Sequence, residues 1–228
     1  MGLQLAIDTS TETASVALSN AAEIVSEMSW HVGRNHTAEF MVNLTYLLRQ
    51  TGVGPASIDA VFVARGPGSF NGLGAGVGTA KGLAFSLRVP IIGIGTLEVE
   101  AFQHARSALP ICPVFDAGRG EIAVALFQQQ DGKWLKLSQE HITTAEGLLS
   151  EIEGRTIFCG RIPTHIASRI EEALGMRAII AGGAARLRRA GYLAELGWMR
   201  LESGELGDAA TLEPLYLRRP AITIKERA

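Results

Sequence analysis

The order of apolar and polar residues along the chain predicts strands and helices in a regular succession. Apolar runs bounded by polar turns predict an antiparallel meander of three strands, over residues 3–7, 14–18 and 23–30. Residues 36–50 then carry phenylalanine and leucine at helical spacing, which predicts an amphipathic helix. Further alternation of short apolar runs with longer segments predicts a strand, a helix, a strand and a helix, at 61–64, 69–85, 90–94 and 96–107.

The same pattern recurs after Leu109-Pro110. Residues 111–115 predict a strand that ends in Asp116, and a glycine turn and a return strand follow it. Later strands and helices are expected near 134–142, from 143, over 156–159, 163–174 and 176–180, and in a long helix to about 201. We therefore expect an α/β protein of two similar lobes, 1–108 and 109–228, that repeats β-β-β-α-β-α around mixed sheets. The C-terminal segment is a candidate for packing back on the first lobe.

The glycine-rich stretch from Arg65 to Phe85 is the most unusual part of the sequence. A turn at 66–68 and a serine suited to capping predict that a helix begins near Ser69. Each glycine costs a helix about 1 kcal/mol relative to alanine, so its presence indicates a close approach of another backbone. Glycine or alanine occurs at every fourth position of one row, at Gly72, Gly76 and Ala80. That smooth face predicts either an internal contact or a docking surface for another chain.

Phosphate binding is the alternative interpretation of this stretch, because a glycine turn that opens a helix presents backbone N–H groups to anions. The P-loop pattern is not met, since no Gly-Lys-Ser/Thr step occurs. The dinucleotide pattern G-x-G-x-x-G is not met either. Helix packing is therefore the favoured interpretation.

Composition and charge narrow the class of protein. The chain has 228 residues, 47% of them hydrophobic and 19% charged, which suits a large core. A net charge of −2 gives no general attraction to nucleic acid or anionic membrane. Basic residues cluster near the C-terminal end of the sequence, at Arg186, Arg188, Arg189, Arg218, Arg219, Lys225 and Arg227. The favoured interpretation is that they form a solvated helix face and a solvated tail. Two cysteines in apolar surroundings, and no signal peptide or transmembrane run, predict a cytoplasmic location.

Both expected lobes begin with a strand that ends in aspartate, at Asp8 and Asp116. This is the layout of the actin-like ATPase group, whose two hairpins face each other and hold phosphates and a metal. Gly182-Gly183 would lie where such folds hold adenosine. Candidate remnants of nucleotide or phosphate loops are therefore Asp8, Thr9, Ser10, Asp116, Gly182 and Gly183. The plain alternative is that both aspartates cap turns.

Several short motifs resemble one family over nearly the whole chain. They are Leu5-Ala6-Ile7-Asp8-Thr9-Ser10-Thr11, His36-Thr37, Gly66-Pro67-Gly68-Ser69-Phe70, Ala80-Lys81-Gly82-Leu83-Ala84, Thr96-Leu97-Glu98, Asp116-Ala117, Gly120-Glu121 and Pro214-Leu215-Tyr216-Leu217-Arg218. In this order they resemble the TsaB (YeaZ) family, and the Gly-Pro-Gly-Ser-Phe segment is specific to the TsaB/TsaD-like group. Departures from the family pattern are Asn71, Gly74 and an arginine shifted by one place, Arg119.

The resemblance implies a non-catalytic subunit in tRNA threonylcarbamoyladenosine biosynthesis. Such a subunit docks on TsaD, which transfers threonylcarbamoyl to the adenosine beside the anticodon, and the P-loop ATPase TsaE joins the assembly. The first lobe would bind the partner, through an interface expected at His36, Phe40, Leu44, Leu47, Phe70, Gly72, Leu73, Gly76, Val77 and Ala80. The resemblance also implies a homodimer when the subunit is alone, contact with tRNA only through the complex, and ATP, ADP and metal on partner subunits rather than on this one.

Enzymatic alternatives are weaker on the residues themselves. TsaD holds its metal with H-x-x-x-H on a helix, and no two histidines here are four residues apart, so no metal site and no metallopeptidase is expected. No G-x-S-x-G occurs, although the sequence leaves a Ser-His-Asp site open. The resemblance implies that the subunit has no catalytic residue. A small-molecule phosphotransferase of the actin-like group remains the alternative, because Asp8 and Asp116 suit it. The loop after Asp116 lacks the glycine and hydroxyl residues usual in that group, and equilibrium binding of ATP would discriminate the two functions.

Overall fold

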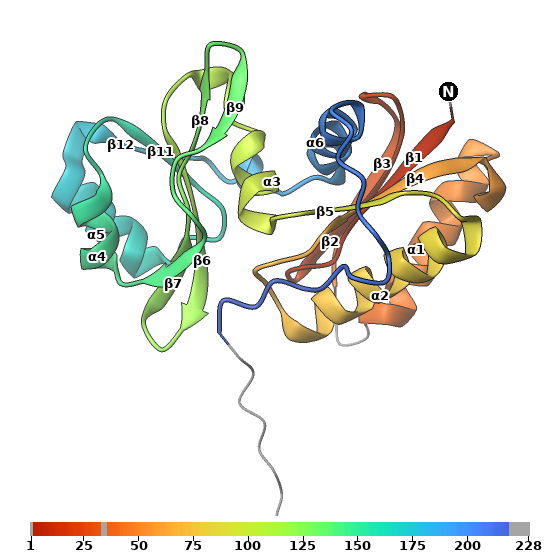
Figure 1. Cartoon of the computed structure of the whole chain (residues 1–228). Helices are drawn as coiled ribbons and strands as arrows, with labels where there is room; N and C mark the ends of the chain where they lie inside the picture. The colour runs from red at the N-terminus through yellow and green to blue at the C-terminus, as the bar shows by residue number, and fades with distance from the viewer. Residues whose placement is uncertain (1, 33–35, 219–228) are drawn as a thin grey trace, which may run out of the picture.

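Two mixed β-sheets lie side by side and form the centres of two lobes (Figure 1). The computed structural model describes residues 2–32 and 36–218, to which the structural statements below refer. Within this part of the chain, no helix is both long and apolar enough to span a bilayer. The expected two-lobed α/β architecture is confirmed.

The first sheet has the strand order β3-β2-β1-β4-β5. Its strands are β1 (Leu3–Asp8), β2 (Thr13–Asn20), β3 (Glu23–His31), β4 (Ile58–Ala64) and β5 (Ile91–Ile94). The first three strands form an antiparallel meander, whereas β4 and β5 run parallel to β1. The meander predicted from the apolar runs is therefore confirmed.

Helices cover both faces of this sheet, because its strands are apolar on both sides. One face, with Val61 and Val63, packs against α1 (His36–Thr51) and α2 (Phe70–Leu87). The other face, with Ala60 and Phe62, packs against α6 (Ala190–Glu202). In Figure 1 the sheet lies between α6 on one side and the α1–α2 pair on the other.

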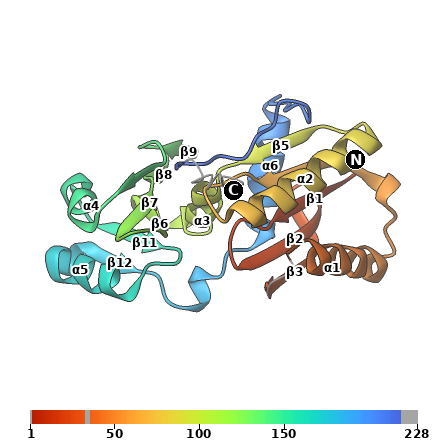
Figure 2. The same ribbon diagram turned by 90° about the horizontal axis from the view of Figure 1, so that it is seen from below.

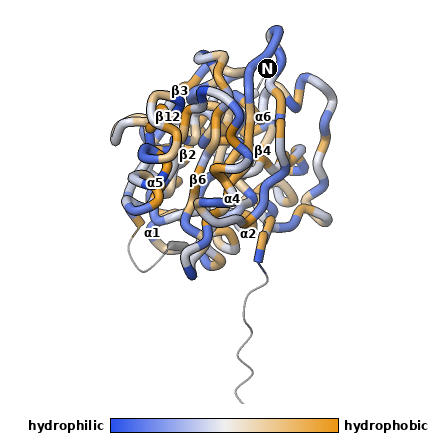
Figure 3. Tube along the Cα trace, turned by 90° about the vertical axis from the view of Figure 1, so that its left-hand side faces the viewer, coloured by the Kyte–Doolittle hydropathy of each residue, from blue (hydrophilic) through white to orange (hydrophobic). Residues whose placement is uncertain are grey.

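The second sheet has the order β10-β7-β6-β11-β12, with β8 pairing to β6 and β9. Its strands are β6 (Ile111–Gly118), β7 (Glu121–Val124), β8 (Phe127–Gln130), β9 (Lys133–Lys136), β10 (His141–Thr143), β11 (Thr156–Cys159) and β12 (Ala178–Ile180). Helices α4 (Ala145–Glu151) and α5 (Thr164–Leu174) cover one face. Figure 3 shows hydrophobic residues gathered along the central strands and hydrophilic ones in the outer loops.

Helix α3 (Thr96–Phe102) lies between the two sheets (Figure 2), and all seven of its residues are buried. Leu97 and Ala101 pack on the second sheet, whereas Val99 and Phe102 pack toward the first lobe. The expected helix to residue 107 is shorter, because a separate 3-10 turn, Ala105–Ser107, follows it. A short helix with two apolar sides thus joins the lobes.

Helix α6 covers the first sheet, although it follows the last strand of the second sheet. It follows β12 in sequence but crosses to the first lobe, where Leu193 and Ala194 belong to the same core as Ala6 and Ala17. Small side chains on the sheet let the helix approach closely. A Cβ at Gly197 would lie 2.2 Å from the ring of Phe62, so only glycine fits there.

The segment that follows α6, residues 204–218, also returns to the first lobe and forms a strap over its edge. Gly207 forms a bridge to Ile91, and Lys81 Nζ donates a hydrogen bond to the carbonyl of Leu212 (2.9 Å). The Leu215 amide then donates to the carbonyl of Arg65 (2.6 Å). The strap therefore runs from the far edge of the first sheet toward the boundary between the lobes.

The glycine row of α2 is internal, so Gly72, Gly76 and Ala80 form the internal contact and not the docking surface, which were the two alternatives for this row. Ser69 caps the helix as predicted, its side chain accepting from the Gly72 amide. The row then lies against the end of β1, where Thr9 Oγ1 donates to the Gly72 carbonyl (2.7 Å). A Cβ at Gly76 would lie 2.1 Å from Thr9 Oγ1. The glycines therefore serve the close approach of α2 to β1.

Gly76→Ala should destabilise the protein by about 1–3 kcal/mol, because the added methyl group overpacks the contact with Thr9. Gly78→Ala is the matched control on the same helix, since a Cβ there meets no atom within 4 Å. It should stabilise by up to about 1 kcal/mol through helix propensity. Chemical unfolding of both variants measures the difference, and equal effects would contradict the internal placement of Gly76.

Candidate functional site

The carboxylate of Asp8 ends β1 and lies at the boundary between the two lobes, almost fully buried. The Ser10 amide and hydroxyl donate to its Oδ1 atom, at 2.9 and 2.6 Å. This turn back onto the backbone is the geometry that aspartate favours after a strand. The hairpin thus fixes a negative charge in a place that water barely reaches.

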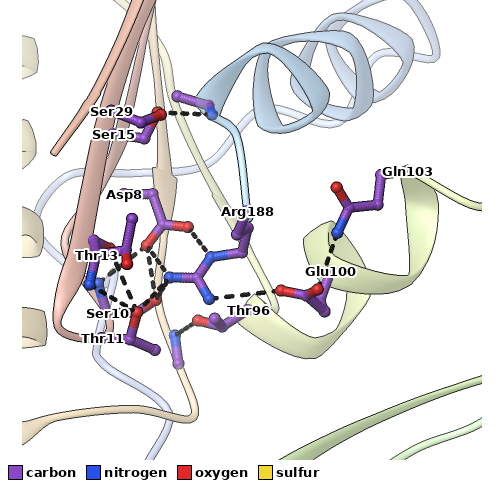
Figure 4. Close-up of polar contacts among 12 residues, drawn as sticks. Asp8, Ser10, Thr11, Thr13, Ser15, Ser29, Thr96, Glu100, Gln103 and Arg188 are labelled. Carbon is purple, nitrogen blue, oxygen red and sulfur yellow. Dashed lines mark hydrogen bonds and ion pairs between the residues drawn. The ribbon is translucent and has the colours of Figure 1, made fainter. Parts of the chain in front are cut away.

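Arg188 supplies the opposite charge, and its own side chain is only 5% exposed. Its Nε donates to Asp8 Oδ2 and its Nη2 to Asp8 Oδ1 (3.2 Å), so the pair is bidentate (Figure 4). Nη2 also donates to the hydroxyls of Ser10 and Thr11, at 3.0 Å each. The guanidinium carbon lies 5.6 Å from the ring centroid of Phe115, on the second sheet.

Glu100, from helix α3, is the third ionisable group of this cluster. Its Oε2 lies 3.7 Å from Nη1 of Arg188, and Gln103 Nε2 donates to its Oε1 (2.8 Å). The pKa of Glu100 is raised to about 7, because burial and, to a smaller extent, nearby Asp8 raise it by more than Arg188, Gln103 and the Gly160 amide lower it. One guanidinium therefore faces two buried carboxylates, Asp8 and Glu100.

An open cleft of about 830 Å³ lies beside this cluster, between the lobes. Its walls include Ser10 and Ser69 from the first lobe, Asp116 from the second, and the strap residue Tyr216. The rings of Tyr216 and Phe70 pack with centroids 5.4 Å apart. Ion pairs border the cleft on its exposed side, at Glu12–Arg161 and Glu121–Arg218.

The candidate phosphate loops come together only in part. Ser10, Asp116 and Gly183 all border the cleft, but the Asp8 carboxylate points to Arg188 instead. Asp116 is exposed, and its Oδ1 accepts from the Gly118 amide (2.8 Å), as a turn cap does.

The actin-like layout implies a bound nucleotide together with a metal ion. The residues at the corresponding place in this chain are not suited to hold these ligands. Both oxygens of Asp8 already accept hydrogen bonds from a cationic side chain of the chain itself. In the described residues no three His, Cys, Asp or Glu side chains gather in a way that could hold a metal ion. The negative charge of Asp8 in the first hairpin is therefore neutralised by Arg188 of the same chain.

The expected partner-interface residues are mostly part of the core. Buried against the first sheet or within α2 are Phe40, Leu44, Leu47, Gly72, Leu73, Gly76, Val77 and Ala80. Phe70 is exposed and stacks on Tyr216. His36 begins α1, but its side chain lies outside the described part of the structure.

The outer face of α1 and α2 carries different residues, which the sequence pattern had not singled out. Met41, Val42 and Tyr46 on α1 and Phe85 on α2 are exposed, with Val42 at 68% and Phe85 at 80%. A second glycine row on α2 is exposed too and has open space where each Cβ would be: Gly74, Gly78 and Gly82. We call these seven residues the outer helix face. An exposed apolar area of this kind is typical of a protein–protein contact.

Comparison with known proteins identifies the family. A family model described as TsaD, tRNA N6-adenosine threonylcarbamoyltransferase, matches residues 30–226. The tRNA threonylcarbamoyladenosine biosynthesis protein TsaB of Bacillus subtilis is 32% identical over 217 residues, which are 94% of this chain and 93% of that protein. The chain belongs to the TsaB (YeaZ) family.

Solved structures agree with this assignment to the TsaB family. YeaZ from Pseudomonas aeruginosa has a TM-score of 0.78 and 26% identity, covering 95% of this chain and 100% of that one. A ROK hexokinase from Thermus thermophilus has a TM-score of 0.52 and 12% identity, covering 89% and 99% of the two chains. The hexokinase shares the fold alone.

Arg188 and Glu100 are the site residues that sequence analysis missed. Arg188 was assigned to a solvated basic cluster, which is wrong because its side chain is buried. Glu100 was not among the candidate residues, because an acid near the start of a helix is ordinary. One signal in the sequence was available. Arg188 lies just before a helix made mostly of apolar residues, and such a helix has to pack on a sheet, which places Arg188 near the core.

The unfolding free energy should fall as pH rises from about 5 to about 8. Native Glu100 keeps its proton up to about pH 7, whereas the unfolded chain releases it near the ordinary pKa of 4.5. The native state therefore binds more protons in this window, and the slope can reach about −1.4 kcal/mol per pH unit. Glu100→Gln should remove this component from denaturant titrations at several pH values. An unchanged slope in the variant would contradict the assignment.

Proposed function

We propose that this TsaB-family protein acts in tRNA threonylcarbamoyladenosine biosynthesis as a non-catalytic subunit that docks on TsaD. In this role it supports transfer of the threonylcarbamoyl group by TsaD to the adenosine beside the anticodon of tRNA. The observation that carries the proposal is the outer helix face, a set of exposed apolar side chains beside exposed glycines. In the same proposal TsaE joins the larger complex, and nucleotide and metal bind to the partner subunits.

The match to the TsaD family model supports a homologous partner. It extends over residues 30–226, so α1, α2, strands β4 and β5 of the first sheet and the whole second sheet have counterparts in the transferase family. Two homologous chains can pair through equivalent surfaces around a pseudo-two-fold axis, as identical chains do around a true one. The same face would then form a homodimer when TsaD is absent, and the two pairings would compete.

The chemistry of the outer helix face suits close helix packing. Gly74, Gly78 and Gly82 leave open space along α2 where a partner helix can approach its backbone. Val42 and Tyr46 on α1 add exposed apolar area. Such a surface selects a partner by shape and apolar contact rather than by charge.

The state of the first hairpin supports a non-catalytic role. A phosphotransferase of this fold needs its hairpin carboxylate free for a metal or phosphate-bound ligand. Here Asp8 is paired with Arg188. The same guanidinium also donates hydrogen bonds to two hydroxyl groups of the hairpin. The second candidate function, phosphoryl transfer, is therefore not favoured by any contact in the structure.

Gly78→Leu should weaken binding to TsaD about tenfold to a hundredfold, because a large side chain would occupy the open space beside α2 that a partner helix needs. The fold should survive, since the position is open and loses a helix-breaking glycine. Calorimetry with TsaD of the same organism measures the affinity, and a reconstituted tRNA-modification assay measures the consequence.

Met176→Asp is the matched control, because Met176 is 94% exposed but lies on the other lobe. It should bind TsaD with unchanged affinity. If Gly78→Leu keeps its melting temperature and still binds at full affinity, the docking surface lies elsewhere. Sedimentation of the protein alone should show the Gly78→Leu variant with a weaker homodimer than the wild type.

A further inference from the structure

We infer that Arg188 is a built-in latch between the lobes, standing in for the ligand that bridges the two hairpins in nucleotide-binding members of this fold. The structure assigns it this place through contacts with three separate elements. It pairs with Asp8 on the first hairpin, faces Glu100 on α3, and lies over the ring of Phe115 on β6. The inference does not depend on the docking of TsaD.

The position of Arg188 in the chain makes it suitable for joining the lobes. It lies on the segment that leaves β12 in the second lobe and enters α6 in the first. Two residues further along, the Ala190 amide donates a hydrogen bond to Ser15 Oγ (2.9 Å) on β2. The segment is thus tied to the first hairpin at two adjacent places, by a side chain and by the backbone (Figure 4).

Glu100 extends the connection to the second lobe. The backbone N–H of Gly160, which follows β11, lowers the pKa of the Glu100 carboxyl group. The Cys159 thiol, beside it, lies 3.8 Å from the Glu100 carbonyl oxygen. A continuous line of polar contacts therefore runs from Asp8 through Arg188 and Glu100 to the second sheet.

Other ion pairs near the boundary are poor candidates for this role. In Glu12–Arg161 both side chains are more than half exposed, and such pairs contribute little. Arg188 and Asp8 are 5% and 1% exposed, and removal of one partner would leave the other charge buried. The closed arrangement of the lobes therefore depends on the guanidinium.

The surroundings of the guanidinium also define what could replace it. Two carboxylates, two hydroxyls and an aromatic ring surround the flat cation. When Arg188 is truncated, the empty site should accept a small planar guanidinium ion. It should discriminate against an ammonium ion, which lacks the fork that matches a carboxylate.

The test measures the distance between the lobes in the full-length protein. Spin labels are placed on Gln50→Cys in the first lobe and Glu153→Cys in the second, both exposed sites, while the native thiols are buried. Pulsed electron paramagnetic resonance then gives the distance distribution. We expect one narrow distribution for the otherwise wild-type chain and no change on addition of MgATP. A change with MgATP would overturn the inference, because the hairpin would then be free to take a nucleotide.

Arg188→Ala should broaden this distribution and lower the melting temperature, and millimolar methylguanidinium should restore both. Methylammonium at the same concentration should restore neither. Arg189→Ala is the matched control, because Arg189 is exposed and pairs with Glu27 inside the first lobe. It should leave the distribution narrow.

Arg188→Lys covers the case in which the alanine variant does not fold. Lysine keeps the charge but loses the planar fork, so the distribution should be broader than in the wild type. A narrow, wild-type distribution in Arg188→Lys, or in a folded Arg188→Ala, would overturn the inference. Equal rescue by methylammonium and methylguanidinium would overturn the assignment of a guanidinium-shaped site.

Discussion

The ion pair between Asp8 and Arg188 is the constraint on which the arrangement of the lobes depends. A carboxylate buried at the end of β1 must be matched by a cation, because an unpaired charge in this place would be very costly. The cation comes from a residue 180 positions further along the chain. To bring it there, the chain has to leave the second sheet and cross to the first lobe, and α6 begins where that crossing ends.

The same crossing explains how two small sheets share one core region. Helix α3 packs toward both sheets, and α6 closes the face of the first sheet that α1 and α2 leave open. The lobes are thus held by apolar contacts at α3 and by the charged cluster beside it. Because both connections use the inner sides of the molecule, the outer helix face remains available for another chain.

The fold keeps the hairpins of the actin-like group but uses them differently. A hexokinase of the same fold has only 12% identity with this chain, so shared architecture says nothing about shared chemistry. Here the tip of the first hairpin is neutralised by the chain itself, and Asp116 on the second caps its own turn. Together with TsaB-family membership, this agrees with the proposal that the protein acts by binding a partner through its surface rather than by binding a nucleotide in its cleft.

The sequence by itself determined the elements that depend on local periodicity and turn chemistry. The meander, the cap at Ser69 and the repeated order of strands and helices all follow from side chains close together in the chain. Tertiary structure alone decided which sheet α6 covers and which glycine row of α2 faces inward. Gly72–Gly76 and Gly74–Gly78 have the same spacing, and only the packing of Leu73 and Val77 against the core selects between them. The partners of Arg188 were equally hidden, because charge pairing across 180 residues has no local signature.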